Sequence, residues 1–172
     1  MSRLTDFYRG RAMLPTGETI DEVLSWDAAL LERRHDYIQW LFPLQTASAY
    51  NPDAPLLDTP TIVEFRGDPE LRKKLVKAFR TMLAFYGFAC DDKDRSEPTV
   101  TTSPAFEQVS RSWLKAGNHN LLRITRILAS LRVLGLGQYA NALFDCLESL
   151  RVQFGPVIGS SFQYWQQAVR TD

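Results

Sequence analysis

The sequence predicts an all-α protein that folds as one domain. Apolar residues recur at the three- and four-residue spacings of amphipathic helices along most of the chain, and capping residues, prolines and glycines stand at the expected helix ends. No segment sustains the alternation of a half-buried strand. The 172 residues, of which 45% are hydrophobic, suffice for one domain that buries roughly 70% of its unfolded surface. We therefore expect a single compact globule of about seven or eight helices that spans residues 1–172 and has a central helix near 119–134.

The first predicted helices lie between residues 19 and 43. Thr19 and Glu22 have the spacing of a capping box, which predicts that a helix begins at Thr19. A longer helix is expected over 27–42, because apolar residues recur there at helical spacing until Pro43 ends it. Its stripe consists of Leu31, His35, Ile38 and Phe42. Residues 44–59 have no such period, so we expect a loop.

Two further helices are predicted in the middle of the chain. Capping residues precede prolines at 59–60 and at 68–69, which predicts a short helix and then a long one. The long helix should end at Tyr86, since Gly87 is typical of a helix C-terminus. The segment 90–104 is charged and then rich in Thr, Ser and Pro, so we expect a second loop.

Four helices are predicted in the last third of the chain. The first covers 105–114, and the second is the central helix, which Asn118 or Asn120 can cap. The third is expected over about 139–154, until the Gly-Pro pair at 155–156 closes it. The last begins after this pair and is marked by apolar residues at helical spacing.

The charge and cysteine content exclude several classes of protein. Twenty Lys and Arg balance twenty Asp and Glu, which argues against a strongly basic nucleic-acid-binding protein. Cys90 and Cys146 show no metal-ligand spacing, and the chain has only two histidines, so we expect no metal. No glycine-rich phosphate loop is present, and we expect no cofactor. No segment is apolar enough for a signal peptide or a membrane span, which indicates a cytoplasmic protein.

The charges are distributed unevenly along the chain. Residues 15–64 contain nine acidic and two basic residues, whereas 108–144 contain five basic and no acidic residues. The simplest use of this asymmetry is that the two regions face each other. We therefore expect carboxylates of the first helices to lie near Arg123 and Arg126.

A narrow polar stripe runs along the predicted central helix between two apolar flanks. It consists of His119, Arg123, Arg126 and Ser130, which share one helix face. An arginine in such a position must find a carboxylate, carbonyl groups or an anionic ligand, because an unpaired internal charge costs several kcal/mol. Either the protein's own acidic residues pair with the stripe, or an anion binds there, near the free N–H groups of the helix start.

His35 lies in the apolar arc of the helix expected over 27–42. A histidine there is most often a core residue that bonds a neighbouring polar group. It could also belong to a site shared with the start of the central helix. The residues of that site would be His35, Gln39, Asn118, His119 and Asn120. Neither histidine stands in a metal-binding pattern and no nucleophile elbow is present, but either could act as a general base.

Several longer motifs resemble the conserved region of the opioid growth factor receptor family. They are DFYRG at 6–10, HDYIQWLFP at 35–43 followed by Asn51 and Ala54-Pro55, MLAFYG at 82–87, and NHNLLRITRIL at 118–128 followed by residues 130–131 and 134–136. Because these motifs extend over nearly the whole chain, it is identified as a member of this family. The domain expected over 1–172 would then be this conserved domain.

The resemblance implies a receptor-like function. Animal members of the family look like receptors for an enkephalin-type opioid peptide that are associated with the nucleus and restrain cell proliferation. The chain lacks the long C-terminal tail and repeats of animal receptors, so we expect a compact microbial member or an excised domain. No catalytic residues come with the resemblance. Its motifs contain the polar and aromatic residues that we call the polar seam: His35, Gln39, Trp40, Asn118, His119, Asn120, Arg123 and Arg126.

These observations lead to one functional hypothesis and two alternatives. We expect a non-enzymatic domain whose polar seam recognises a small anionic or peptide ligand. The arginines would hold the anion, the amides would orient it, and Trp40 with Tyr37 would form an aromatic wall. The first alternative is an enzyme that uses His35 or His119 as a general base. The second is a purely structural or interaction domain, in which the polar residues form a satisfied network.

Overall fold

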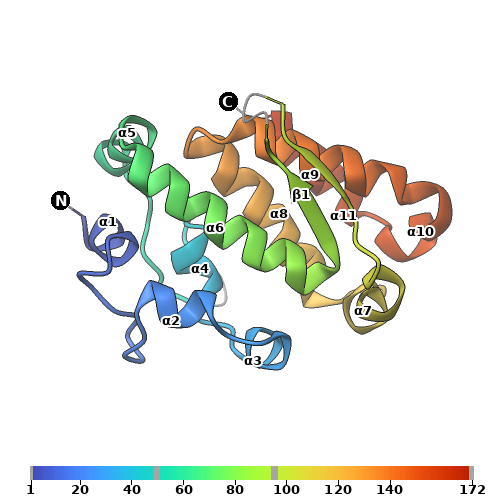
Figure 1. The fold of residues 1–172 in the computed structure, drawn as a ribbon, viewed down its shortest axis with the longest axis horizontal. Coiled ribbons are helices and arrows are strands. Elements are labelled where there is room, and N and C mark those ends of the chain that lie inside the picture. The colour runs from blue at the N-terminus through green and yellow to red at the C-terminus, as the bar shows by residue number, and fades with distance from the viewer. Residues whose placement is uncertain (1, 49–50, 94–96, 171–172) are drawn as a thin grey trace. The chain divides into compact units, whose positions relative to one another are not determined.

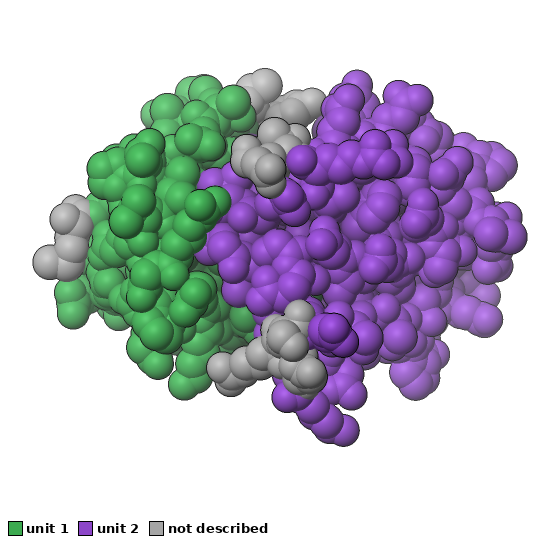
Figure 2. Space-filling view, turned by 90° about the horizontal axis from the view of Figure 1, so that it is seen from above, with its two compact units in different colours: residues 1–81 green, residues 82–172 purple. Residues whose placement is uncertain are grey.

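The computed structural model describes residues 2–48, 51–93 and 97–170. Within these ranges the chain forms eleven helices and one antiparallel pair of strands, so the predominantly helical fold is confirmed (Figure 1). The chain divides into two compact units, Met1–Thr81 and Met82–Asp172, which have different colours in Figure 2. That residues 1–172 form a single domain stays a prediction.

The helices of unit 1 begin where capping residues stand. They are α1 (Arg3–Tyr8), α2 (Ile20–Leu24), α3 (Ala28–Arg33), α4 (Ile38–Leu41), α5 (Thr59–Gly67) and the larger part of α6 (Pro69–Tyr86). The predicted capping box is present, since the N–H of Thr19 donates to the Glu22 carboxylate at 2.7 Å and the N–H of Glu22 donates to the Thr19 hydroxyl at 3.3 Å. The cap of α5 is Asp58 and not Thr59, because the Asp58 carboxylate accepts from the N–H of Thr61 at 2.9 Å.

The predicted helix over 27–42 is wrong in its middle. The structure has two short helices there, α3 and α4, separated by residues 34–37. Arg34 leaves the helical conformation, with φ −87° and ψ 141°. His35 follows it in a non-helical segment and is exposed, so it does not belong to an apolar helix face.

Side-chain contacts explain the break between α3 and α4. The Arg34 guanidinium pairs with Glu18 at 2.9 Å and with Asp36 at 3.0 Å. The buried Tyr37 hydroxyl donates to the carbonyl of Leu31, in the preceding helix, at 3.0 Å. These bonds favour a turn over a continuous helix, and helical spacing alone does not reveal them.

The core of unit 1 is rich in aromatic residues. Phe7 contacts Trp40 with ring centroids 5.4 Å apart, and Tyr8 contacts Phe65 at 4.8 Å. The Tyr8 hydroxyl donates to the carbonyl of Leu41. All of these side chains are buried, so α1, α4 and α5 pack around one cluster of edge-to-face rings.

Unit 2 begins with the last turn of α6. Its other elements are β1 (Phe88–Asp91), β2 (Thr99–Thr102), α7 (Phe106–Trp113), α8 (His119–Val133), α9 (Gly137–Ser149), α10 (Arg151–Ile158) and α11 (Ser161–Arg170). The predicted central helix is confirmed as α8, which packs against α9 and α11, while β2 lies along α9 (Figure 1). The indole N–H of Trp165 donates to the carbonyl of Leu121 at 3.0 Å and joins α11 to α8. The indole N–H of Trp113 donates to the carbonyl of Tyr86 at 3.1 Å.

The loop predicted over 90–104 overlaps a β-hairpin. Its strands pair antiparallel, with Phe88 opposite Thr102. Phe88 and Val100 are buried, so the hairpin covers part of the core of unit 2. The second strand is a run of Thr and Val, whose β-branched side chains favour strands. Four residues are too few to show the alternation that identifies a strand from sequence.

The helix predicted over 139–154 is divided as well. α9 ends at Ser149, and α10 follows with a kink at Phe154, where φ is −116° and ψ is 15°. Pro156 causes the kink, because its ring supplies no N–H and crowds the carbonyl four residues earlier. The Gly-Pro pair therefore bends a helix and does not end it. The two divided helices and the unpredicted α1 explain why the described residues form eleven helices and not the seven or eight expected.

Candidate functional site

The residues of the polar seam are divided between the two units. His35, Gln39 and Trp40 belong to unit 1, and the others belong to unit 2. The unit 2 residues are Asn118, His119, Asn120, Arg123 and Arg126. The structure describes each group within its own unit, and the assembly of the two groups into one site stays a prediction.

The start of α8 is held by the two asparagines. Asn118 is the N-cap, and its side-chain oxygen accepts from the N–H of Asn120 at 2.9 Å. Asn120 is fully buried, and its side-chain oxygen accepts from the Arg123 guanidinium at 3.2 Å. Arg123 is only 6% exposed. The first turn of α8 thus places a buried cation beside the positive end of the helix dipole, which favours a negative partner.

The members of the predicted polar stripe of α8 differ in burial, and Arg123 is more buried than Arg126, which follows it. His119 is exposed, Arg126 is half-buried and Ser130 is fully buried. Burial lowers the pKa of Arg126 below its ordinary value, because a desolvated guanidinium is less stable as a cation. The Ser130 hydroxyl has no hydrogen-bond partner among the described residues. One of the expected apolar flanks is open, since Leu122 is 51% exposed.

The unit 1 residues of the seam surround one turn. His35 is exposed in the segment before α4. The Gln39 side-chain nitrogen donates to the carbonyls of His35 and Asp36, at 3.1 and 3.2 Å. Trp40 is 2% exposed and contacts Phe7. Gln39 and Trp40 therefore hold the local backbone and core of unit 1, and His35 is the accessible member of this group.

Many acidic side chains of unit 1 pair with basic side chains of the same unit. Asp21 binds Lys74 at 2.8 Å and Lys77 at 3.3 Å. The hydrogen bond from Lys74 lowers the pKa of the Asp21 carboxyl. Such pairs neutralise much of the acidic segment 15–64 locally. That carboxylates of this segment lie near the arginines of α8 stays a prediction.

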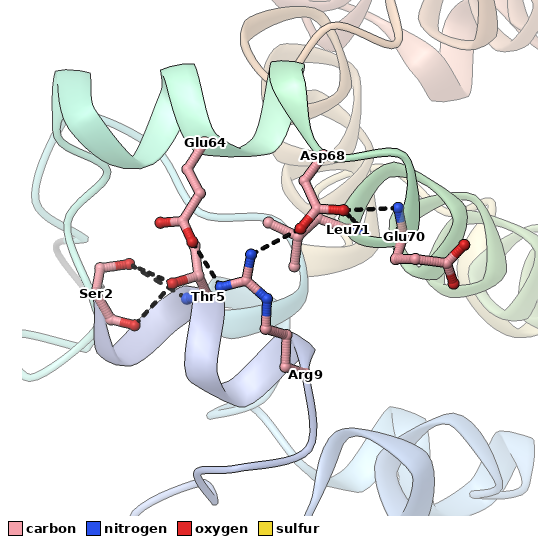
Figure 3. Close-up of polar contacts among 7 residues, drawn as sticks. All are labelled: Ser2, Thr5, Arg9, Glu64, Asp68, Glu70 and Leu71. Atoms are coloured by element: carbon pink, nitrogen blue, oxygen red, sulfur yellow. Dashed lines mark hydrogen bonds and ion pairs between the residues drawn. The ribbon is translucent and has the colours of Figure 1, made fainter.

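Arg9 joins the N-terminal helix to the α5–α6 junction. Its guanidinium contacts Glu64 at 2.5 Å and Asp68 at 2.7 Å (Figure 3). Asp68 in turn accepts from the N–H of Glu70 at 2.9 Å and so caps α6. The hydrogen bond from Arg9 lowers the pKa of the Asp68 carboxyl. This contact fixes three helices of unit 1.

A family model described as the opioid growth factor receptor (OGFr) conserved region matches residues 1–172. The chain belongs to this family. The structure also shows what parts of the resembling motifs do. In DFYRG, Tyr8 and Arg9 anchor α1, and in the motif at 118–128 both asparagines hold the start of α8. Sequence reasoning did not single out Arg9, and only its place in DFYRG could have indicated it.

The curated relatives of this OGFr conserved region are longer proteins. The opioid growth factor receptor of Rattus norvegicus is 38% identical over 171 residues, which are 95% of the chain and 29% of that receptor. The receptor of Homo sapiens is 37% identical and is covered over 25% of its length. Opioid growth factor receptor-like protein 1 of Xenopus tropicalis is 40% identical over 132 residues, which are 75% of the chain and 25% of that protein. No solved structure matches the chain.

Metal-ligating and thiol side chains of this OGFr conserved region bear on other kinds of chemistry. The described residues contain no group of three or more His, Cys, Asp or Glu that could hold a metal ion. Burial raises the pKa of Cys146 to about 11, so its thiol stays protonated at neutral pH. None of the described helices is both long and apolar enough to cross a bilayer. A cytoplasmic location stays a prediction.

Proposed function

We propose that the chain is a non-enzymatic binding domain that recognises a peptide through its polar seam. The observation that carries this proposal is the pair Arg123 and Arg126, two desolvated cations at the N-terminal half of α8. They stand in a motif of a family whose curated members are named opioid growth factor receptors. A desolvated guanidinium is stabilised most by an anion that accepts two hydrogen bonds through two oxygens, such as a peptide carboxylate.

The residues of the polar seam differ in burial, and we assign their roles accordingly. His35, His119 and Arg126 keep accessible surface and would contact the ligand. Asn120 and Arg123 are buried and would position the start of α8. The remaining residues act through the backbone: Asn118 caps α8, and Gln39 and Trp40 hold the turn that presents His35.

The names of the relatives suggest the first ligand to test. We expect an enkephalin-type opioid peptide to bind the purified chain in isothermal titration calorimetry. Replacing Arg126 by glutamine should weaken binding about tenfold or more, because a hydrogen bond to a charged group is lost. The matched control is Arg170→Gln, on the exposed end of α11. The proposal fails if the wild-type chain does not bind the peptide, or if Arg126→Gln binds as tightly as the control.

A structural role for the seam is the second candidate, and the hydrogen bond from the buried Arg123 to Asn120 favours it. In that case Arg126→Gln would leave every ligand affinity unchanged, and the stability change at Arg123 described below would be the main effect. The use of His35 or His119 as a general base stays a prediction.

A further inference from the structure

Unit 2 contains a groove that shares no residue with the polar seam. It has a volume of about 690 Å³ and lies between α7 and α10, at the end of β2. Pockets that hold small ligands typically measure about 300–1,000 Å³. The lining residues that matter here are Phe106, Glu107 and Arg111 of α7, and Leu150, Gln153 and Phe154 on the opposite wall.

The apolar part of the groove is held firmly in place. Phe106 stacks on Phe88 with ring centroids 5.4 Å apart, and it contacts Phe154 edge to face at 6.4 Å. Phe106 is buried, and Phe154 sits at the kink of α10, which Pro156 maintains. Phe154, which is half-buried and packs against Phe106, therefore presents a preformed aromatic surface, and a ligand that covers it orders little new structure.

The α7 wall carries two opposite charges. Glu107 and Arg111 are both exposed and lie one helical turn apart. Among the described residues, neither side-chain charge has a hydrogen bond or an ion pair. Side chains four positions apart on a helix have Cβ atoms separated by about 6 Å. The groove thus offers a carboxylate and a guanidinium, on side chains that begin one helical turn apart, beside the aromatic surface.

We propose that this groove binds an extended peptide segment in which a basic and an acidic residue flank an apolar one. In an extended strand, side chains two positions apart point to the same side and are about 6.6 Å apart. That spacing is close to the separation of the Cβ atoms of Glu107 and Arg111 on α7. The intervening side chain points to the opposite wall, towards Leu150 and Phe154. This binding is independent of the function proposed for the seam.

The test uses synthetic pentapeptides with blocked ends. The probe is Gly-Lys-Phe-Glu-Gly, titrated into the labelled whole chain and followed by NMR. We expect a Phe-to-Ala change in the probe to weaken binding about tenfold, because the apolar side chain no longer covers the aromatic surface. Glu107→Lys should weaken binding of the probe about threefold to fivefold, since the pair is solvent-exposed.

Charge exchange makes the test specific. The Glu107→Lys chain should prefer Gly-Glu-Phe-Glu-Gly over the original probe, whereas the wild-type chain should prefer the original. Glu148→Lys, an exposed change on α9 outside the groove lining, is the matched control and should keep the wild-type preference. The inference is overturned if the probe causes no shifts at the groove, if the alanine probe binds equally well, or if Glu107→Lys leaves the preference unchanged.

Discussion

Arg123 and Arg126 lie three positions apart on α8, yet their surroundings differ. Arg123 is almost fully buried, and its guanidinium donates to a buried amide oxygen of Asn120. Arg126 keeps part of its surface, although burial lowers its pKa. The first residue is therefore placed to hold the helix start, and the second is the one that would contact a ligand in the function proposed above. Their substitutions should affect different measurements.

Replacing Arg123 by methionine should lower the free energy of unfolding by about 1–3 kcal/mol, because the buried Asn120 oxygen loses a donor. The measurement is urea denaturation at neutral pH. The double variant Arg123→Met, Asn120→Leu should recover part of the loss, since two apolar side chains then replace both polar partners. Lys115→Met, at an exposed position, is the control. If Arg123→Met is as stable as Lys115→Met, the hydrogen bond between Arg123 and Asn120 contributes nothing to stability.

The junction between α6 and β1 depends on the backbone of Gly87. Its φ is +83°, and a Cβ at this position would lie 3.0 Å from the Cα of Phe106. A side chain would therefore meet both a left-handed conformation and the backbone of α7. The glycine allows helix, strand and the next helix to approach closely.

Gly87→Ala should destabilise the protein by about 1–2 kcal/mol from the left-handed conformation alone, and the contact with Phe106 should add to this loss. Gly67→Ala, at the end of α5, is the matched control, because nothing lies within 4 Å of its Cβ position and its φ is not positive. Thermal melts of the two variants measure the difference. Equal melting temperatures would contradict the argument.

Helices could be predicted from the sequence where capping residues and helical spacing indicate the same boundaries. They could not be predicted where contacts with residues far along the chain determine the backbone conformation. The start of α2 and most of α8 follow from caps and spacing, which are local. The break at 34–37 depends on Arg34 pairing with Glu18, 16 positions earlier, and the β-hairpin depends on the pairing of two four-residue strands. The site shows the same division. Helical period predicts the common face of α8, but the burial along it depends on neighbouring helices.

At the scale of the whole molecule, unit 1 contains several acid-sensitive ion pairs among the described residues. Hydrogen bonds from Arg34 and Lys74 lower the pKa values of Asp36 and Asp21. A carboxyl whose folded pKa is lowered stabilises the fold while it is ionised. Its contribution is complete above about pH 5 and is lost progressively as the pH falls from about 4, the pKa range of unfolded carboxyls, through the lowered pKa of the folded state. Acidic pH should therefore lower the stability of unit 1.

We expect unit 1 to lose hydrogen-exchange protection at a higher pH than unit 2. The chain is incubated between pH 7 and pH 3, and its amides are then labelled in a pulse at one fixed pH. Arg34→Gln should make the protection of unit 1 less dependent on pH, and added salt should act in the same direction, because it screens exposed charges. Simultaneous loss of protection in both units would contradict this expectation.

The contact of Arg9 with Glu64 and Asp68 also makes one helix dependent on another. Both carboxylates stand at the C-terminal end of α5, where the helix dipole is negative and two like charges four positions apart repel each other. Arg9 offsets this electrostatic conflict from 55 positions earlier in the sequence. A fragment that begins after α1 would keep the conflict and lose its compensation. The last turn of α5 should therefore be less stable when the N-terminal segment is not docked against it.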